Sequence, residues 1–177
     1  MGSIRRTSKF FLGLAALAWC GLIFRLSRQS YAQQSIRPWL RKLAPKEVIS
    51  ERLPEVTVYY DGAVIVARQD PYRFIEFFVR KGGHLTIYAI LAAIATFALR
   101  SLPGMRAKRA IATAVVLVLT LIVALTDEGL QSRAALRTPT LLDVGVDLIG
   151  AVIGLWISWG FGRKRRDTSR KRKDDQA

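Results

Sequence analysis

The sequence predicts an all-α membrane protein, with four transmembrane helices in a compact bundle and a small extracytoplasmic β-hairpin between helices 1 and 2. Two observations predict this fold. The 51% of hydrophobic residues fall into four apolar blocks, and each approaches the ~20 residues that cross a bilayer. A polar stretch divided by prolines separates the first two blocks and carries a hairpin-turn signal. We expect spans at about 10–26, 82–100, 109–127 and 143–162.

The first span follows a short basic segment, residues 1–9, and superficially resembles a secretory signal peptide. No small-residue cleavage site follows the uncharged run 10–24, and Trp19 stands before Cys20, where a lipoprotein-type site needs a small residue. We therefore predict a retained anchor. Because Cys20 is the single cysteine of the chain, no intrachain disulfide is possible.

The extracytoplasmic loop, residues 27–78, is mixed in composition and divided into short pieces by four prolines. Within it, the apolar runs 56–60 and 63–67 flank Asp61-Gly62, which is typical of a two-residue type I′ hairpin turn. An isolated hairpin is marginal in water, so this one should lean on the membrane surface or on the helix ends. Tyr60 and its neighbour either line a pocket or contact lipid headgroups, and we favour the second interpretation.

The second span begins with a polar stripe. Lys81, His84 and Tyr88 are separated by three and four residues, so they share one face of a continuous helix. The pair Gly82-Gly83 would either let another backbone approach that face or break the helix just before His84.

The third span ends in an acidic motif. Asp127 and Gln131 are four residues apart on one helical face, and Glu128 lies about 100° round from Asp127. A loop containing Arg133 and Arg137 follows.

The fourth span opens with a second acidic pair, Asp143 and Asp147, again four residues apart. Gly150-x-x-x-Gly154 comes next, a close-packing pattern of membrane helices. Residues 163–177 hold eight Lys or Arg and three Asp, and we expect a disordered basic cytoplasmic tail against an anionic leaflet.

Charge in the short segments predicts the topology. Three basic residues precede the first span, four lie between the second and third, and eight follow the fourth, against two between the third and fourth. The positive-inside rule therefore puts both termini in the cytoplasm of a multi-pass protein. The formal charge of +15 is explained by these clusters, and no nucleic-acid motif accompanies them, so no nucleic-acid partner is expected.

This topology brings the stripe of the second span and both acidic motifs to the outer face. Charged groups at membrane depth cost a few kcal/mol or more and usually face a bundle interior, a water-filled cavity or a partner charge. We therefore expect one polar, water-accessible pocket at the outer leaflet.

The combination of these motifs resembles the VanZ-like family of bacterial membrane proteins, best over residues 74–155. Phe-Ile-Glu-Phe-Phe-Val-Arg-Lys-Gly-Gly-His precedes one span, Asp-Glu-x-x-Gln follows the next, and Leu-Leu-Asp-Val leads into a Gly-containing helix. The family takes its name from a protein that raises resistance to teicoplanin, a lipid-tailed glycopeptide. The resemblance implies a location in the bacterial cell membrane and a role in the cell envelope.

The resemblance also marks a polar set in this chain: Lys81, His84, Asp127, Glu128, Gln131, Arg137, Asp143 and Asp147. Two positions depart from the family pattern. Many members have His where this chain has Leu130, and a Pro-Gly-Arg turn where it has Ala-Leu-Arg. A chemistry that relied on that second His could not operate here.

Two functions remain open from the sequence. The first is an enzyme acting on a lipid-linked or cell-surface substrate, with catalytic groups His84, Asp127 and Glu128. Adjacent acids in a low-dielectric pocket cannot both ionise cheaply, so one could serve as an acid, with His84 as a base. Substrate-binding roles then fall to the remaining polar groups: Lys81, Tyr88, Gln131, Arg137, Asp143 and Asp147. No helix carries a sharp metal signature such as H-E-x-x-H, so we predict no metal and no cofactor; a divalent ion on the carboxylates and His84 is the alternative.

The second function is non-enzymatic: a protein that binds a lipid or a partner. In the limiting case the polar residues form only a structural charge network, since buried charges are paired as a rule. The expected partners are the lipid bilayer and either a lipid-linked envelope precursor or a lipoglycopeptide. No feature of the sequence specifies an oligomeric state.

Overall fold

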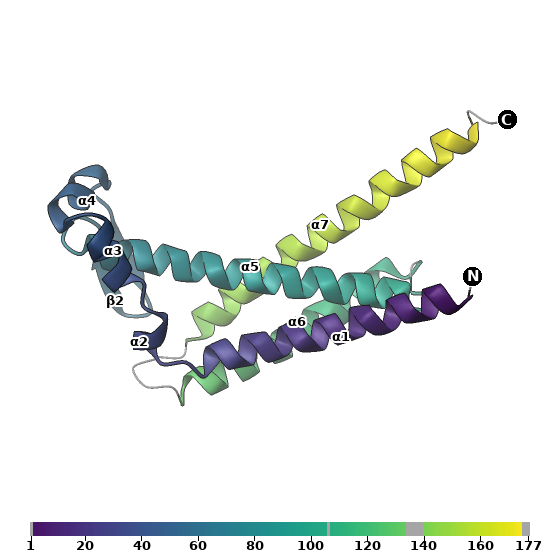
Figure 1. The fold of residues 1–177 in the computed structure, drawn as a ribbon, viewed down its shortest axis with the longest axis horizontal. Helices are drawn as coiled ribbons and strands as arrows, with labels where there is room; N and C mark the ends of the chain where they lie inside the picture. Colours follow the sequence, from purple (N-terminus) through teal and green to yellow (C-terminus); the bar gives the residue numbers. More distant parts are fainter. Residues whose placement is uncertain (1, 106, 134–139, 175–177) are drawn as a thin grey trace.

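The computed structural model describes residues 2–105, 107–133 and 140–174, with side chains described from residue 10 to residue 160 of these ranges. Its long helices are α1 (Gly2–Ser27), α5 (Pro71–Ser101), α6 (Arg109–Gln131) and α7 (Leu141–Asp174). Each contains a segment long and apolar enough to cross a membrane: Phe10–Ser27, Pro71–Ser101, Arg109–Gln131 and Leu141–Gly160. The predicted fold class is confirmed (Figure 1).

The segment between α1 and α5 is folded. It contains α2 (Tyr31–Gln34), α3 (Arg37–Leu43), α4 (Lys46–Arg52) and the antiparallel strands β1 (Thr57–Tyr60) and β2 (Ala63–Val66). Tyr60 pairs with Ala63, and Asp61 and Gly62 between them both have positive φ, as a type I′ turn requires. This confirms the predicted hairpin. It packs on the start of α5 through a small apolar cluster built on Ile65, Ala67 and Phe74.

Helix α5 begins earlier than the predicted second span and is continuous. Asp70 caps it by accepting a hydrogen bond from the Arg73 amide at 3.2 Å, with Pro71 in the first turn, where its missing N–H costs nothing. The helix runs on through Gly82 and Gly83, and a Cβ at either glycine would meet nothing within 4 Å. The expectation of a helix break or a close backbone approach there is wrong: no proline follows Pro71 in this helix to interrupt it, and the close approach occurs at other glycines.

The close approach occurs at Gly150 and Gly154 of α7, which lie against Leu85 and Ala89 of α5. A Cβ on Gly150 would stand 2.5 Å from the Leu85 carbonyl oxygen, and one on Gly154 would lie even closer to the Ala89 carbonyl oxygen. The two contacts are four residues apart on both helices, so together they set the register of α7 along α5. One turn before these contacts, this register brings the polar ends of the two helices together.

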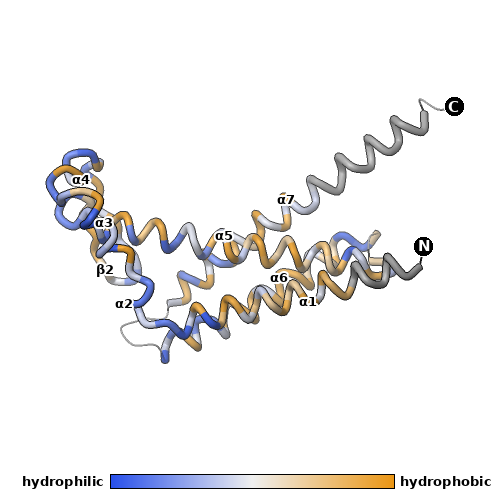
Figure 2. The backbone as a smooth tube through the Cα atoms, in the orientation of Figure 1, coloured by the Kyte–Doolittle hydropathy of each residue, from blue (hydrophilic) through white to orange (hydrophobic). Residues whose placement is uncertain are grey.

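The hairpin, the end of α1 and the start of α7 lie at one end of the bundle, while α1 begins and α7 ends toward the other (Figure 1). Apolar residues follow the middle of the helices, and hydrophilic residues gather at the loop end (Figure 2). Large apolar side chains such as Leu17 and Trp156 stay exposed, which suits contact with lipid.

Helix α7 continues to Asp174, so the expectation of a disordered tail is not met within the described residues. Arg and Lys are good helix formers, and no proline interrupts residues 161–174.

Candidate functional site

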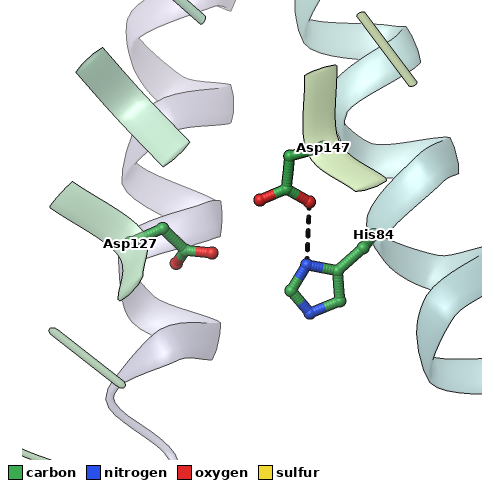
Figure 3. Close-up of side chains that lie close together, drawn as sticks. All are labelled: His84, Asp127 and Asp147. Atoms are coloured by element: carbon green, nitrogen blue, oxygen red, sulfur yellow. Dashed lines mark hydrogen bonds and ion pairs between the residues drawn. The ribbon is translucent and has the colours of Figure 1, made fainter. Parts of the chain in front are cut away.

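The centre of the site is a pair formed across the α5–α7 contact. His84 Nδ1 lies 2.9 Å from Asp147 Oδ1, and Asp147 is fully buried, with 0% of its surface exposed (Figure 3). When Nδ1–H donates to the carboxylate, the ring is oriented and Nε2 is left as an acceptor, base or metal ligand.

Asp127 of α6 faces this pair from the opposite side (Figure 3). It is 2% exposed and accepts hydrogen bonds from the Ser27 hydroxyl of α1 and from the Gln131 amide, the latter at 3.0 Å. One ligand atom each from His84, Asp127 and Asp147 lies within 4.8 Å of the others. Four helices therefore contribute to one polar cluster.

A second ion pair lies one turn nearer the loop end. Asp143 Oδ1 accepts hydrogen bonds from the Lys81 ammonium and from the Tyr60 hydroxyl of the hairpin. The ammonium also stands 4.1 Å from the centre of the Tyr60 ring, a cation–π distance. Burial raises the pKa of Tyr60, and its hydrogen bond to Asp143 raises that pKa further. Tyr60 thus belongs to the polar cluster, and our preference for headgroup contact is not supported.

Two buried carboxylate oxygens near the pair have no hydrogen-bond partner among the described residues. Glu128 Oε2 accepts a hydrogen bond from the Thr140 amide at 2.9 Å, but its Oε1 is unpartnered, as is Asp147 Oδ2. Buried polar groups are normally satisfied. The cluster is therefore not a closed structural network.

A cavity of about 330 Å³ opens beside His84 and Asp127. Its apolar side is lined by Ile23, Leu26 and Ile87, and its polar side includes Gln131 and Arg80. Arg80 Nη1 is buried and has no hydrogen-bond partner in the described part of the chain, although the guanidinium stacks 4.7 Å from the Tyr31 ring centre. Arg80 and Gln131 also line a neighbouring cavity of about 240 Å³ that reaches Lys81, Asp143 and Tyr60.

Glu76 is a polar centre whose role the sequence reasoning missed. It is 1% exposed and accepts hydrogen bonds from the Tyr31 and Ser35 hydroxyls and from the Ile36 amide. Arg37 Nε lies 3.3 Å from Glu76 Oε1. This carboxylate fastens the segment after α1 to α5, and the signal for it was an acid inside the apolar run 74–79.

The model of the VanZ/LLP1 family matches residues 12–162. The chain belongs to the VanZ/LLP1 family. Comparison with curated proteins and with solved structures found no match. In this VanZ/LLP1 protein the family match covers most of the chain, including the motifs from which the resemblance was inferred.

The polar positions of the VanZ/LLP1 pattern fall into three groups in the structure. His84, Asp127 and Asp147 meet at the centre, with Gln131 bonded to Asp127 and Tyr88 buried beside them. Lys81 and Asp143 pair with each other, and Glu128 binds the start of α7 through Thr140. Arg137 lies outside the described residues. Their roles in catalysis or binding stay predictions.

Proposed function

We propose that this VanZ-like membrane protein binds an anionic, lipid-linked envelope precursor at the outer leaflet, through the 330 Å³ cavity beside His84. The observation that carries this proposal is the two-sided lining of the cavity. The lining combines apolar groups of α1 and α5 with polar groups that include Arg80, His84 and the carboxylate of Asp127. Such a cavity suits a ligand with a hydrocarbon chain and a polar headgroup.

The outer location follows from charge. The short basic segments favour cytoplasmic termini, so the hairpin end of the bundle faces outward in this proposal. Lipid-linked precursors of the bacterial envelope are used on that side of the membrane.

Arg80 supports an anionic headgroup. Lys81 is already engaged by Asp143 and Tyr60, so it is a poor candidate for a free phosphate-binding cation. Arg80 keeps a buried Nη1 unpartnered and borders both cavities. A guanidinium binds phosphate in bidentate fashion, and its planar donors are suited to this geometry.

The His84–Asp147 pair supports chemistry at the bound headgroup. A histidine oriented by a buried carboxylate can move a proton through its second nitrogen, as in other acid–base sites. An enzyme of this kind would consume or alter the lipid-linked ligand. A non-enzymatic protein would shield it, and either action provides a route to altered teicoplanin susceptibility.

The alternative is a structural charge network, supported by the two closed pairs Lys81–Asp143 and His84–Asp147. Two buried oxygens without a hydrogen-bond partner among the described residues, Glu128 Oε1 and Asp147 Oδ2, argue against it as the whole explanation. A network retained for stability alone would leave few such groups.

The test is lipid binding by purified protein in nanodiscs, with a polyprenyl phosphate as probe and uncharged polyprenol as its comparison. Arg80→Gln should weaken binding of the phosphate by at least about tenfold, since a bidentate charged contact is lost. Arg68→Gln, which breaks an exposed ion pair with Glu55 outside both cavities, is the matched control and should bind normally.

Equal binding of polyprenol and polyprenyl phosphate, or full binding by Arg80→Gln, would refute the proposal. Incubation of the bound phosphate lipid then separates the two actions. An enzyme forms product in proportion to time, whereas a shielding protein forms none.

A further inference from the structure

We infer that His84, Asp127 and Asp147 bind a divalent transition-metal ion, Zn²⁺ or Mn²⁺, at the centre of the bundle. The inference concerns the same cavity as the proposed lipid ligand, but metal binding requires no lipid. Sequence patterns alone favoured a metal-free site, because the three ligands come from three different helices and form no local signature.

The geometry provides three donors around one point. The donor atoms of the imidazole and the two carboxylates lie within 4.8 Å of one another, and both acids are buried. Donors held 2.0–2.2 Å from a metal ion stand roughly 3 to 4 Å apart. Small rotations of the carboxylates would close that gap.

The unpartnered atoms indicate where an ion would be held. Asp147 Oδ1 is used by His84, while its Oδ2 is buried and unpartnered and points to the side on which Asp127 lies (Figure 3). The hydroxyl of Tyr88 is also buried and lies beside Asp127 and Asp147. A buried carboxylate oxygen without a donor is normally expected to have a hydrogen-bond partner or a metal ion.

Charge balance gives the sign of the ligand. Asp127 is held by neutral donors from Ser27 and Gln131, and Glu128 by a backbone amide. Among the described residues, His84 is the one cation-forming side chain within ion-pair distance of Asp127, Glu128 or Asp147. In their ionised forms the three acids outnumber the described cations in contact with them, and a divalent cation would neutralise the difference.

The donor types give the class of metal. One imidazole and two carboxylates suit Zn²⁺ or Mn²⁺, whereas Ca²⁺ and Mg²⁺ prefer oxygen ligands alone. Three protein ligands also leave a coordination position open, as in metal sites that bind water or a substrate oxygen. The cavity borders His84 and Asp127, so that position is accessible from it.

The experiment uses the full chain in nanodiscs, with any affinity tag removed, stripped with EDTA and then supplied with Zn²⁺ or Mn²⁺ alone. Calorimetry and elemental analysis should find about one ion per chain. Asp127→Asn and Asp147→Asn should each lower the affinity at least about tenfold, because loss even of groups that merely orient metal ligands costs that much. Glu55→Gln is the matched control: it neutralises an exposed carboxylate that pairs with Arg68 outside both cavities, and it should bind the ion normally.

A second measurement does not depend on the variants folding. Co²⁺ bound to the parent protein should give the absorption and X-ray absorption signatures of one nitrogen and several oxygen ligands. Failure of the parent to bind a stoichiometric ion, an all-oxygen signature, or unchanged affinity in a well-folded Asp147→Asn protein would overturn the inference. Polyprenyl phosphate binding measured in EDTA keeps the two proposals separate, because either can fail while the other holds.

Discussion

Gly154 of α7 lies directly against the backbone of Ala89 in α5, with no room between them for a Cβ atom. Substitution Gly154→Ala should therefore lower the thermal unfolding temperature, since overpacking typically costs about 1–3 kcal/mol. Gly160→Ala on the same helix is the matched control, because a Cβ there meets nothing within 4 Å. A Gly154→Ala protein as stable as the parent would show that α7 does not pack on α5 in this way.

Removal of the negative charge of Asp127 and Glu128 should abolish function but leave the helix bundle folded. Asp127→Asn and Glu128→Gln keep shape and most hydrogen bonding, and polar pairs in membrane proteins add only about 0.6 kcal/mol each on average. We expect normal membrane abundance and thermal stability, with loss of the envelope protection proposed for the parent, measured as susceptibility to teicoplanin or to another envelope stress. If both variants protect cells like the parent, the acids have no functional role; if both disappear from the membrane, their role is structural.

A cysteine at Gly62 tests the orientation. It lies at the turn of the hairpin, and the positive-inside rule puts this turn outside the cell. In a Cys20→Ala background, Gly62→Cys should react with a membrane-impermeant maleimide in intact cells. Labelling that requires permeabilised cells would reverse the topology and with it the outer-leaflet proposal.

Glu76 should control how firmly the segment after α1 is held. Glu76→Gln removes the charge that pairs with Arg37 and presents an amide to the donors of Ser35 and Ile36. Hydrogen exchange at residues 35–37 should accelerate, because buried acceptors of several bonds are costly to replace. Glu55→Gln, which alters an exposed carboxylate paired with Arg68, should leave exchange in this segment unchanged.

Tyr60 should titrate at higher pH than an ordinary tyrosine. Burial first, and then the hydrogen bond to Asp143, raise its pKa above the usual value near 10. The stabilisation from this shift is fully present below about pH 10 and is lost as pH rises toward the folded-state pKa. The phenolate absorbance of Tyr60 is obtained by subtracting the spectrum of a Tyr60→Phe protein, both in the parent and in the Asp143→Asn background. It should appear at lower pH in the Asp143→Asn background. An identical titration in both backgrounds would contradict the contact.

The sequence predicted the membrane helices and the hairpin, because apolar block length and turn chemistry are local properties. It did not predict which groups would pair. The pairing of His84 with Asp147 depends on the register between α5 and α7, which Gly150 and Gly154 set through contacts with Leu85 and Ala89.

The two unexpected polar residues have similar explanations. Arg80 becomes the candidate phosphate-binding cation because its neighbour Lys81 forms an ion pair with Asp143. That ion pair joins residues 62 positions apart. Glu76 binds a segment about 40 positions earlier in the chain. Neither relationship is encoded in helical periodicity, so spacing patterns alone could not reveal it.

The pairing of α5 with the last helix has a consequence for biosynthesis. His84 enters the membrane on α5, but its partner Asp147 is translated 63 residues later. At about 5 to 20 residues per second, Asp147 is synthesised roughly 3 to 13 s after His84. During this interval Lys81 also lacks Asp143, so the nascent chain carries two uncompensated polar groups at the membrane. A ribosome stalled before α7 would leave a product in which neither His84 nor Lys81 has its carboxylate partner.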